Sequence, residues 1–499
     1  TININSIVDG GQHIDGITAG IFGGGMAIST LGGSANANTT GKTEINVEKG
    51  LSVGLVGGGL AVATDASQYI KDNDGELDGT TTIDPNGLPP ITISRLNDGG
   101  TSKVTSGDVN INLSGDSSAA VVLGSGVAIS HQNSPQGIAP TESDKISTST
   151  VEVGNTNIVV DVNKNIGENK EEIPAILTAI KGIIKQENLV DNVQTIVENT
   201  KDKGIVFGVA GNGISMAADK GVSTVTANNT NIDLQNGYVV GVLGNGISTG
   251  NAWTKSTTEV KEKAKIDING AEVIGVSGNG MAIYYGAGNY DGSLGFDGKV
   301  ITKVKDSEIN VNSGSVDGLF GGGIAIDDSQ VDKTNAEAIT SGTSTINVTG
   351  GYVKDFGYEH LNGIMGTNAP DGTQDIKAYY KEVKTLGDGV AIFGGGVAAG
   401  NMANVSVANS VINVSSGKID GDIVAGGIAT AGATSTVENS TINITGGEIN
   451  GSLYGQGKAT KLDTPIESVI ESGKATVTNS NLVIDGYKGI IKSINDFHS

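Results

Sequence analysis

The chain has 499 residues, of which 78 are glycine and only 4% are aromatic, a composition that excludes a bulky, layered globular core. Its formal net charge is −23 and Arg95 is its single arginine, which argues against nucleic acid or anionic membrane as a partner. Cysteine is absent, so disulfides and thiolate metal sites are excluded, and no run of about 18 or more apolar residues predicts a membrane-spanning helix.

A glycine element recurs ten times along the chain, often about 30 to 34 residues apart, a spacing typical of repeat proteins. No copy reads GxxxxGK[ST], the pattern of a phosphate-binding loop, and none opens a predicted helix, so we interpret the glycines as structural. The copies, with the number of their first residue, are IFGGGMAI at 21, LVGGGLAV at 55, VLGSGVAI at 122, VAGNGISM at 209, VLGNGIST at 242, VSGNGMAI at 276, LFGGGIAI at 319, IFGGGVAA at 392, IVAGGIAT at 423 and LYGQGKAT at 453.

A second element alternates apolar, polar and apolar residues, as in Ile45-Asn46-Val47, Ile309-Asn310-Val311 and Ile442-Asn443-Ile444. Alternation with period two predicts a strand with one buried face. Such a strand buries that face by pairing with the same strand one coil away, at about 4.8 Å. The sequence therefore predicts an all-β fold, a parallel β-helix or solenoid of about 30-residue coils forming one domain over residues 1–499.

Stretches that break the repeat are expected to form insertions, which in solenoids map to loops and often to the binding face. Residues 64–106 form the first predicted loop insertion. It contains the acidic run Asp72 to Asp78, which offers hard oxygen ligands but lacks the ligand spacing of an EF-hand or a calcium β-roll. We expect no metal site, and leave open whether this run binds an ion.

Residues 163–203 differ in kind, because Ile173, Ile176, Ile180 and Ile183 are spaced as on one face of a helix. The register slips before Val190, so we predict a helical hairpin insertion. Two helices this short are marginal alone, and they must dock either on the solenoid or on other subunits. The second alternative allows a homotrimer.

Two further insertions, 284–300 and 352–388, gather nine of the 19 aromatic residues. Tyrosine is enriched in binding hot spots because it offers a large amphipathic surface at low entropic cost; the alternative is that these rings pack the insertions onto the stack. Trp253, the only tryptophan, presents the same two alternatives. The candidate partner-binding residues are Trp253, Tyr284, Tyr285, Tyr290, Tyr352, Phe356, Tyr358, Tyr379 and Tyr380.

Catalytic constellations are weak. Gly115 to Ser118 faintly resembles a serine-protease nucleophile loop without a base or an orienting carboxylate nearby. Asp327 and Asp328 could serve as the carboxylates of a β-helical polysaccharide hydrolase. The four histidines are isolated from one another and from any metal-binding pattern. We therefore predict no enzyme activity, no catalytic residues and no cofactor.

The segment STINITGGEINGSLYGQGKAT at 440–460, echoed at 410–430 and 344–353, resembles the passenger repeats of Gram-negative autotransporter adhesins. The resemblance covers most of the chain outside the insertions. It implies export through the outer membrane by a C-terminal β-barrel and display at the bacterial cell surface. No series of amphipathic strands follows residue 480, so we expect that anchor to be absent from this chain.

The expected function is therefore that of a surface adhesin, which displays loops on a solenoid to bind a host cell-surface glycoprotein. An immunoglobulin-like receptor of the CEACAM family is one partner of this kind. Two alternatives are a β-helical polysaccharide lyase or hydrolase and a passive surface or biofilm protein. The near-absence of arginine argues against a lyase, because bidentate recognition of acidic sugars favours that side chain.

Overall fold

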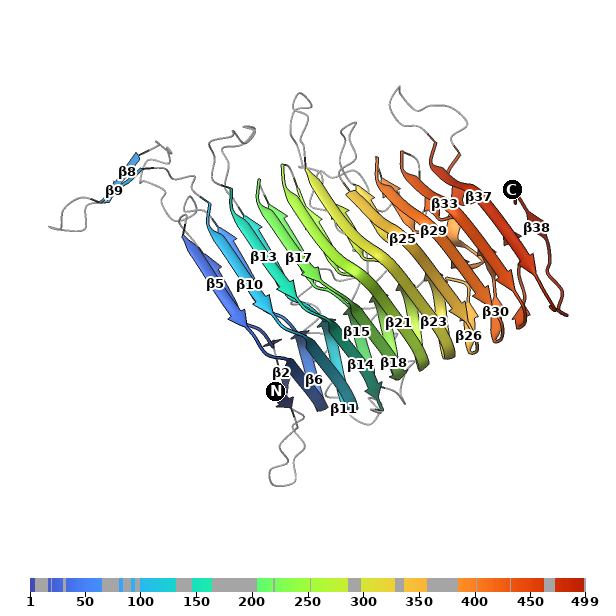
Figure 1. Ribbon diagram of the computed structural model, residues 1–499, viewed down its shortest axis with the longest axis horizontal. Helices are drawn as coiled ribbons and strands as arrows, with labels where there is room; N and C mark the ends of the chain where they lie inside the picture. The colour runs from blue at the N-terminus through green and yellow to red at the C-terminus, as the bar shows by residue number, and fades with distance from the viewer. Residues whose placement is uncertain are drawn as a thin grey trace.

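The computed structural model describes most of the repeats, with gaps between them. The ranges are 1–4, 17–18, 20–29, 33–64, 80–83, 91–94, 99–131, 146–163, 204–218, 220–251, 253–285, 298–327, 336–356, 385–400, 402–430, 432–461 and 472–497. Within them the protein is all-β, as predicted, and its strands stack side by side from the N-terminal to the C-terminal end (Figure 1). The helical hairpin predicted for 163–203 lies outside the described residues, apart from Asn163.

One large parallel sheet contains the predicted alternating strands. Each strand pairs with strands of the repeat before and the repeat after it, and long strands such as β21 pair with three strands of the preceding repeat, so the pairings form one closed network. Its longer strands are β6 (Thr43–Val56), β11 (Val109–Leu123), β21 (Lys255–Ser277), β23 (Lys299–Phe320), β25 (Ala336–Val348), β29 (Asn404–Val414), β33 (Thr434–Ile444) and β37 (Lys474–Ile484).

Shorter strands complete this sheet. In the first half of the chain they are β1 (Ile2–Ile4), β2 (Ile17–Thr18), β3 (Ile21–Phe22), β5 (Ser34–Thr39), β10 (Thr101–Ser106), β13 (Thr148–Val153), β14 (Thr156–Val162), β15 (Ile205–Ala210), β17 (Val222–Ala227), β18 (Thr230–Asn236) and β19 (Tyr238–Leu243). In the second half they are β26 (Tyr352–Lys354), β27 (Val390–Phe393), β30 (Lys418–Asp420), β31 (Asp422–Val424), β34 (Glu448–Ile449), β35 (Leu453–Tyr454) and β38 (Ile494–Asn495).

The ten glycine elements are the turns between this sheet and a second one. Each element is followed by one strand of a ten-stranded parallel sheet, and the strands stack in sequence order. They are β4 (Met26–Ser29), β7 (Leu60–Thr64), β12 (Val127–His131), β16 (Ile214–Ala218), β20 (Ile247–Gly250), β22 (Met281–Tyr284), β24 (Ile324–Asp327), β28 (Val397–Gly400), β32 (Ile428–Ala429) and β36 (Lys458–Ala459).

The turns require glycine because the backbones of successive repeats almost touch there. A Cβ atom on Gly246 would lie 2.0 Å from the carbonyl oxygen of Gly213, and one on Gly213 would lie 1.9 Å from that of Gly126. These contacts are far inside van der Waals distance, so a side chain would force the repeats apart. The structural interpretation of the glycine element is confirmed.

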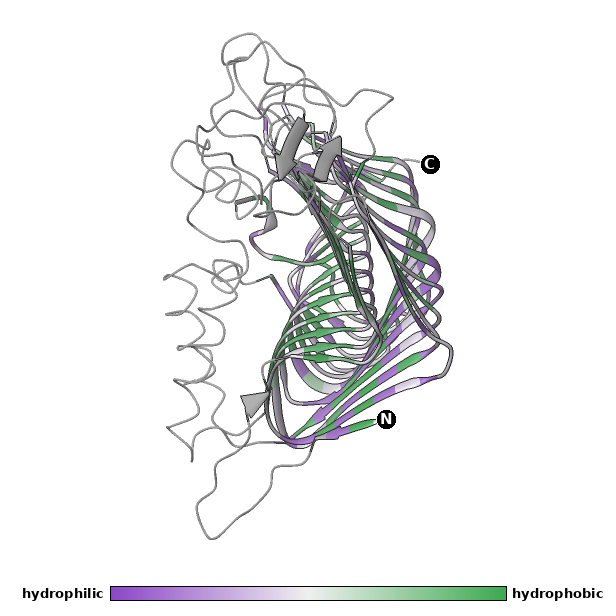
Figure 2. Ribbon diagram, turned by 90° about the vertical axis from the view of Figure 1, so that its left-hand side faces the viewer, coloured by the Kyte–Doolittle hydropathy of each residue, from purple (hydrophilic) through white to green (hydrophobic). Residues whose placement is uncertain are grey.

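The core is a set of rows that run along the stack, one residue from each repeat. One such inner row contains Ile45, Ile111, Ile158, Ile232, Ile266, Ile309, Ile346, Ile412 and Ile442, all fully buried or nearly so. Apolar and polar residues alternate along the strands around this interior, as the hydropathy colouring shows (Figure 2). The register keeps each apolar residue above its equivalent, which buries an apolar face that a single strand leaves exposed.

Several of the predicted insertion boundaries fall inside strands, since Thr64 ends β7 and Tyr284 ends β22. The stack resumes with β10 at Thr101, inside the range 64–106. Ser102 and Val104 are buried in the interior, so β10 belongs to the stack and not to the insertion. Residues 299–300 begin β23, and Tyr352–Lys354 form β26, which pairs with β23 and β30. Within the first insertion, β8 (Thr80–Ile83) and β9 (Ile91–Ser94) form a two-stranded antiparallel sheet.

Candidate partner-binding surface

Five long connections leave the stack at one common edge, which we call the loop edge, whereas residues 5–16, 164–203 and 355–389 connect strands at other junctions. It is the junction between the ends of the second-sheet strands and the starts of the next strands of the large sheet. The register aligns Thr64 with His131 and Ala218 on the first side of this junction, and Thr101 with Thr148 and Val222 on the other.

The connections across the loop edge differ greatly in length. Residues 219–221 span it after Ala218, whereas residues 65–100 span it between β7 and β10. The longer connections at this edge are 65–100, 132–147, 285–298, 328–335 and 460–473; the short ones are 30–33, 219–221, 251–254, 401–403 and 430–433. Because the flanking strands stay in register, additional chain at this edge does not disturb the stack.

Trp253 and Tyr285 lie at the loop edge in neighbouring repeats. Trp253 occupies the short turn 251–254 with φ of 56°, a left-handed conformation that a side chain adopts only at a cost of about 1 to 2 kcal/mol. Lys220 and Met402 also have positive φ in the equivalent turns. Gly432 has positive φ in a further equivalent turn, and glycine is the residue that adopts this conformation most easily. Tyr285 directly follows β22, its amide donates to the Gly250 carbonyl, and its side chain is 45% exposed.

Two of the predicted contact residues are buried, and their assignment to a binding surface is wrong. Tyr284 is 1% exposed and packs among small residues such as Val300 and Ala325. Phe356 is 4% exposed and makes an edge-to-face contact with Phe320 at 5.2 Å between ring centroids. Both rings fill the interior, the packing alternative that the sequence left open. Tyr290, Tyr358, Tyr379 and Tyr380 lie outside the described residues.

Tyr352 lies on a different face, in a network of charged side chains. Its ring is 5.0 Å from Lys418 Nζ and 5.4 Å from Lys354 Nζ, within the range of cation–π contacts. Its hydroxyl donates to Asp420 Oδ2, which also pairs with Lys418 Nζ at 3.0 Å. Asn450 Nδ2 donates to Asp420 Oδ1 at 2.6 Å, which completes the Tyr352 cluster.

The contacts of the Tyr352 cluster shift the pKa values of Asp420 and Tyr352. The hydrogen bond from Tyr352, followed by that from Asn450 and the pairing with Lys418, lowers the pKa of Asp420 to about 2. The same bond raises the pKa of the Tyr352 hydroxyl. Nearby, burial and the charges of Asp388 and Asp317 raise the pKa of Asp355. At neutral pH the Asp420 carboxyl of the cluster is therefore ionised.

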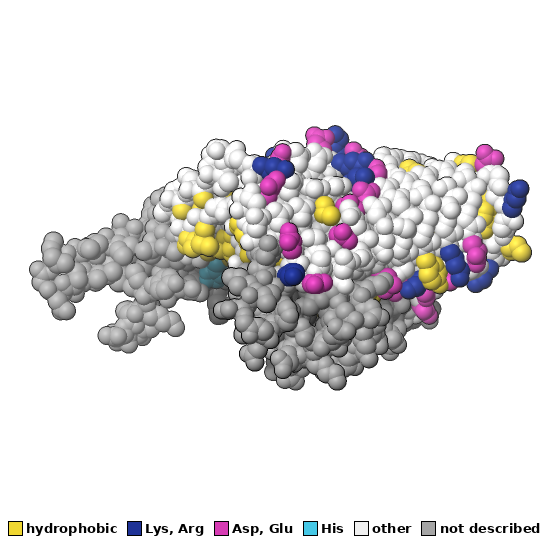
Figure 3. Space-filling model, turned by 90° about the horizontal axis from the view of Figure 1, so that it is seen from below, with side chains coloured by type: hydrophobic (Ala, Val, Ile, Leu, Met, Phe, Trp, Pro, Cys, Tyr) yellow, Lys and Arg dark blue, Asp and Glu magenta, His cyan; other side chains and the backbone are white. Residues whose placement is uncertain are grey.

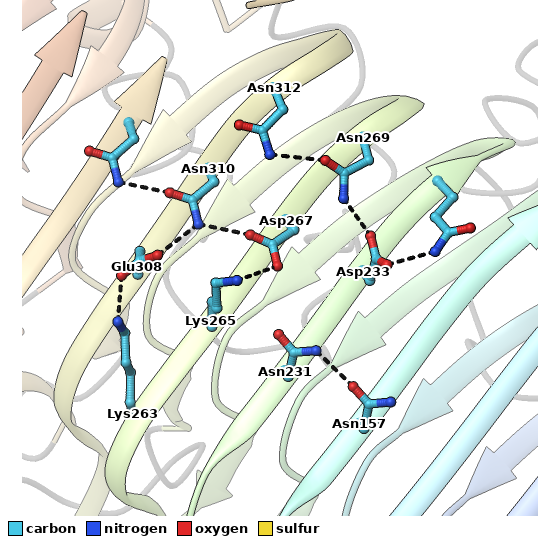
Figure 4. Close-up of polar contacts among 12 residues, drawn as sticks. Asn157, Asn231, Asp233, Lys263, Lys265, Asp267, Asn269, Glu308, Asn310 and Asn312 are labelled. Carbon is cyan, nitrogen blue, oxygen red and sulfur yellow. Dashed lines mark hydrogen bonds and ion pairs between the residues drawn. The ribbon is translucent and has the colours of Figure 1, made fainter. Parts of the chain in front are cut away.

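The outward face of the predicted strands carries ladders of amides that the sequence analysis did not foresee (Figure 4). Asn310 Nδ2 donates to Asp267 Oδ1 at 2.8 Å, and Asn347 Nδ2 donates to Asn310 Oδ1 at 2.7 Å. The row continues through Asn413 and Asn443 at 2.8 Å each. The recurring central Asn or Asp of the triplets is the sequence signal for these ladders.

The catalytic candidates do not assemble a site. Ser117 and Ser118 are buried within β11, so the segment from Gly115 is strand and not a nucleophile loop. Asp327 is fully buried at the end of β24, and Asp328 lies outside the described residues. Within the described ranges, no group of three or more His, Asp or Glu side chains could hold a metal ion. The acidic run Asp72 to Asp78 lies outside them.

Charged side chains of both signs are mixed on the face seen from below (Figure 3). In the described part of the chain, none of the helical segments has the length and apolar character needed to cross a bilayer. Comparison with protein families, curated proteins and solved structures finds no match to this chain.

Proposed function

We propose that this chain is a parallel β-solenoid displayed on a bacterial surface, and that it binds a host cell-surface glycoprotein through segments at its loop edge. The proposed receptor class is the immunoglobulin-like one to which the CEACAM family belongs. The observation that carries the proposal is the position of the longer connections. Five of them begin and end at one edge of a stack whose interior rows are otherwise uniform.

This arrangement separates two roles along the chain. The inner rows consist of apolar residues and small polar ones in every repeat, so they leave little freedom to vary. The loop edge accepts connections of any length, and exposed aromatic residues such as Tyr285 add contact area there. Rigid scaffolds that position variable loops are the usual way in which repeat proteins present a binding surface.

The autotransporter-like repeats favour a bacterial surface as the location and adhesion as the role. No described residue pair favours the polysaccharide lyase or hydrolase, because Asp327 is buried away from solvent. A passive surface or biofilm protein would need no exposed aromatic residues at the loop edge, and it is the outcome that the following experiment would reveal.

The test uses a short connection from the chain itself as the replacement. Each long connection is replaced, one at a time, by the short connection 219–221, which spans the same junction. Binding of each purified variant to receptor-expressing and receptor-free cells is then measured, with circular dichroism and thermal unfolding to verify the stack. We expect shortening of 65–100 or 285–298 to abolish saturable, receptor-dependent binding.

The matched control shortens residues 164–203, which leave the stack at a different junction, between β14 and β15. That variant should bind as the unmodified chain does. If every loop-edge variant folds and binds unchanged, or if the unmodified chain binds no cells at all, the proposed function is wrong.

A further inference from the structure

Six Asn-Gly dipeptides lie in the described part of the chain, and the fold separates them into two groups. The fully buried group belongs to the glycine elements and begins at Asn212, Asn245 and Asn279. The other group is at least partly exposed on the outward face and begins at Asn236, Asn269 and Asn450. The same dipeptide therefore occurs in two opposite environments.

An asparagine followed by glycine can react with its own backbone, because glycine has no Cβ atom to hinder the approach of its nitrogen. The glycine nitrogen attacks Cγ of the asparagine and loses its proton, and Nδ2 leaves as ammonia, which closes a five-membered succinimide ring. Water then opens the ring at either carbonyl and gives aspartate or isoaspartate. The net change replaces the amide by a carboxylate, with water consumed and ammonia released.

Asn269 and Gly270 lie at a bulge in β21, where the register with β23 shifts on both sides of Asn269. Gly270 and Ala271 together face the single residue Gly314, and regular pairing resumes at Glu272. A bulge leaves its extra residue outside the hydrogen-bond ladder. The Gly270 nitrogen is therefore less constrained than a nitrogen within a regular strand.

Both polar atoms of the Asn269 side chain are held by hydrogen bonds (Figure 4). Asn312 Nδ2 donates to Asn269 Oδ1 at 2.9 Å, and Asn269 Nδ2 donates to Asp233 Oδ1 at 2.7 Å. Negative charge develops on Oδ1 when a nitrogen attacks Cγ, so the Asn312 amide lies where an oxyanion requires a donor. Asp233 accepts from the nitrogen that must leave, and its carboxylate stabilises that nitrogen as it becomes ammonium.

The buried dipeptides differ from Asn269 in their access to water. Asn279 Oδ1 accepts from the amide of its own Gly280 at 2.8 Å, and Asn279 Nδ2 donates to the Ile339 carbonyl at 2.9 Å. Asn279 is 0% exposed, so a charged intermediate there would form without solvent around it. Burial also keeps water from the ring that it must open. The fold therefore protects the interior asparagines.

We propose that Asn269–Gly270 is a self-modification site, at which the folded protein converts Asn269 to aspartate or isoaspartate with Asn312 stabilising the transition state. The product places a carboxylate beside Asp233, where an amide donated before, and like charges at this distance repel. Isoaspartate also routes the main chain through Cβ, which lengthens β21 at its bulge. The outward ladder thus breaks at Asn269 with time. This modification does not depend on the receptor proposed above.

The test incubates the purified, folded chain at neutral pH and follows each Asn-Gly dipeptide by peptide mapping and mass spectrometry, with chromatography to separate isoaspartate from aspartate. Asn269 should convert more than about tenfold faster than Asn279, because burial disfavours the charged intermediate. In urea the two dipeptides should convert at similar rates, since both are then solvated. If Asn269 stays intact in the folded chain while it converts in urea, or if Asn279 converts as fast in the folded chain, the proposal is overturned.

Two variants test the role of Asn312, with circular dichroism to verify the stack. Asn312→Asp keeps the shape of the side chain and replaces the donor by a carboxylate, so conversion of Asn269 should slow about tenfold. Asn347→Asp is the matched control: it makes the same change in the neighbouring row and should leave the rate at Asn269 unchanged. Conversion of Asn269 at the unmodified rate in Asn312→Asp, or equal slowing by both substitutions, also overturns the proposal.

Discussion

The repeats around β21 and β23 and those around β29 and β33 share their interior and differ in their outward face. Ile309 and Ile412 occupy the same buried row, and both are at most 1% exposed. Outward, the first region carries ion pairs such as Lys303–Glu259 at 3.1 Å and Lys305–Glu262 at 2.8 Å. The second region presents mostly Asn, Ser and Thr. The stack is therefore specified from the inside, and its outer rows are free to vary.

The largest effect should come from the shared interior. Ile309→Ala and Ile412→Ala each delete buried methyl groups from one inner row, and each should lower the free energy of unfolding by about 2 to 5 kcal/mol. We expect similar losses in the two regions, measured by urea denaturation together with hydrogen exchange of the adjacent strands. A large loss of unfolding free energy for one variant and almost none for the other would show that the two regions do not share an equivalent interior.

The charged repeats also contain a buried asparagine, Asn245, and its removal should have the next largest effect on stability. Asn245 Nδ2 donates to the Lys303 carbonyl at 2.8 Å and the Thr258 carbonyl at 3.2 Å, within a fully buried row of three asparagines. Asn245→Gly leaves these groups without their donor, and should cost about 1 to 3 kcal/mol of unfolding free energy. The equivalent Gly395 and Gly426 show that the turn accepts glycine. An unchanged midpoint in urea would mean that water replaces the amide.

The outward amide row crosses both regions and should contribute less. Asn413 accepts from Asn443 and donates to Asn347, and Asn310 has equivalent contacts with Asn347 and Asp267. Asn413→Ala and Asn310→Ala should each cost about 0.5 to 1.5 kcal/mol. The carboxylate partner should make the Asn310 loss the larger of the two. Urea denaturation of both variants in one buffer checks this order.

The ion pairs should contribute least and should respond to salt. A double-mutant cycle of Lys303→Ala and Glu259→Ala should give a coupling below about 1 kcal/mol, because both side chains are partly exposed to solvent. The coupling should fall further at high ionic strength, whereas the effect of Asn413→Ala should not change. A coupling that survives high salt would show that the charged face is more than a solvated surface.

The Tyr352 cluster adds a test by pH. Because the pKa of Asp420 is held at about 2, below its ordinary value of 3.8, its stabilising contribution is complete above that ordinary value and is lost as the pH falls toward 2. Tyr352→Phe removes the strongest cause and should move the Asp420 pKa upward, as measured by NMR titration of the carboxyl carbon. Lys303→Ala is remote from the cluster and should leave that pKa unchanged.

The positions of the repeats could be inferred from the sequence with little loss. The ten glycine elements mark the ten strands of the second sheet, and the Ile-Asn-Val triplets mark buried strands of the large sheet. Aromatic residues were interpreted less well, because composition does not distinguish Tyr284 from Tyr285. Of these two neighbours, Tyr284 is buried and Tyr285 is exposed.

The sequence by itself determined the strand pattern, the parallel stacking and the need for glycine, because each follows from a local periodicity or from the absence of a side chain. Only the tertiary structure showed which side chains of different strands and repeats are in contact. The amide ladders, the cluster of Tyr352 with Lys418 and Asp420 and the common loop edge join residues of different repeats or different strands. Such contacts join particular polar side chains across strands, and a local periodicity indicates which residues face inward but not which outward side chains meet.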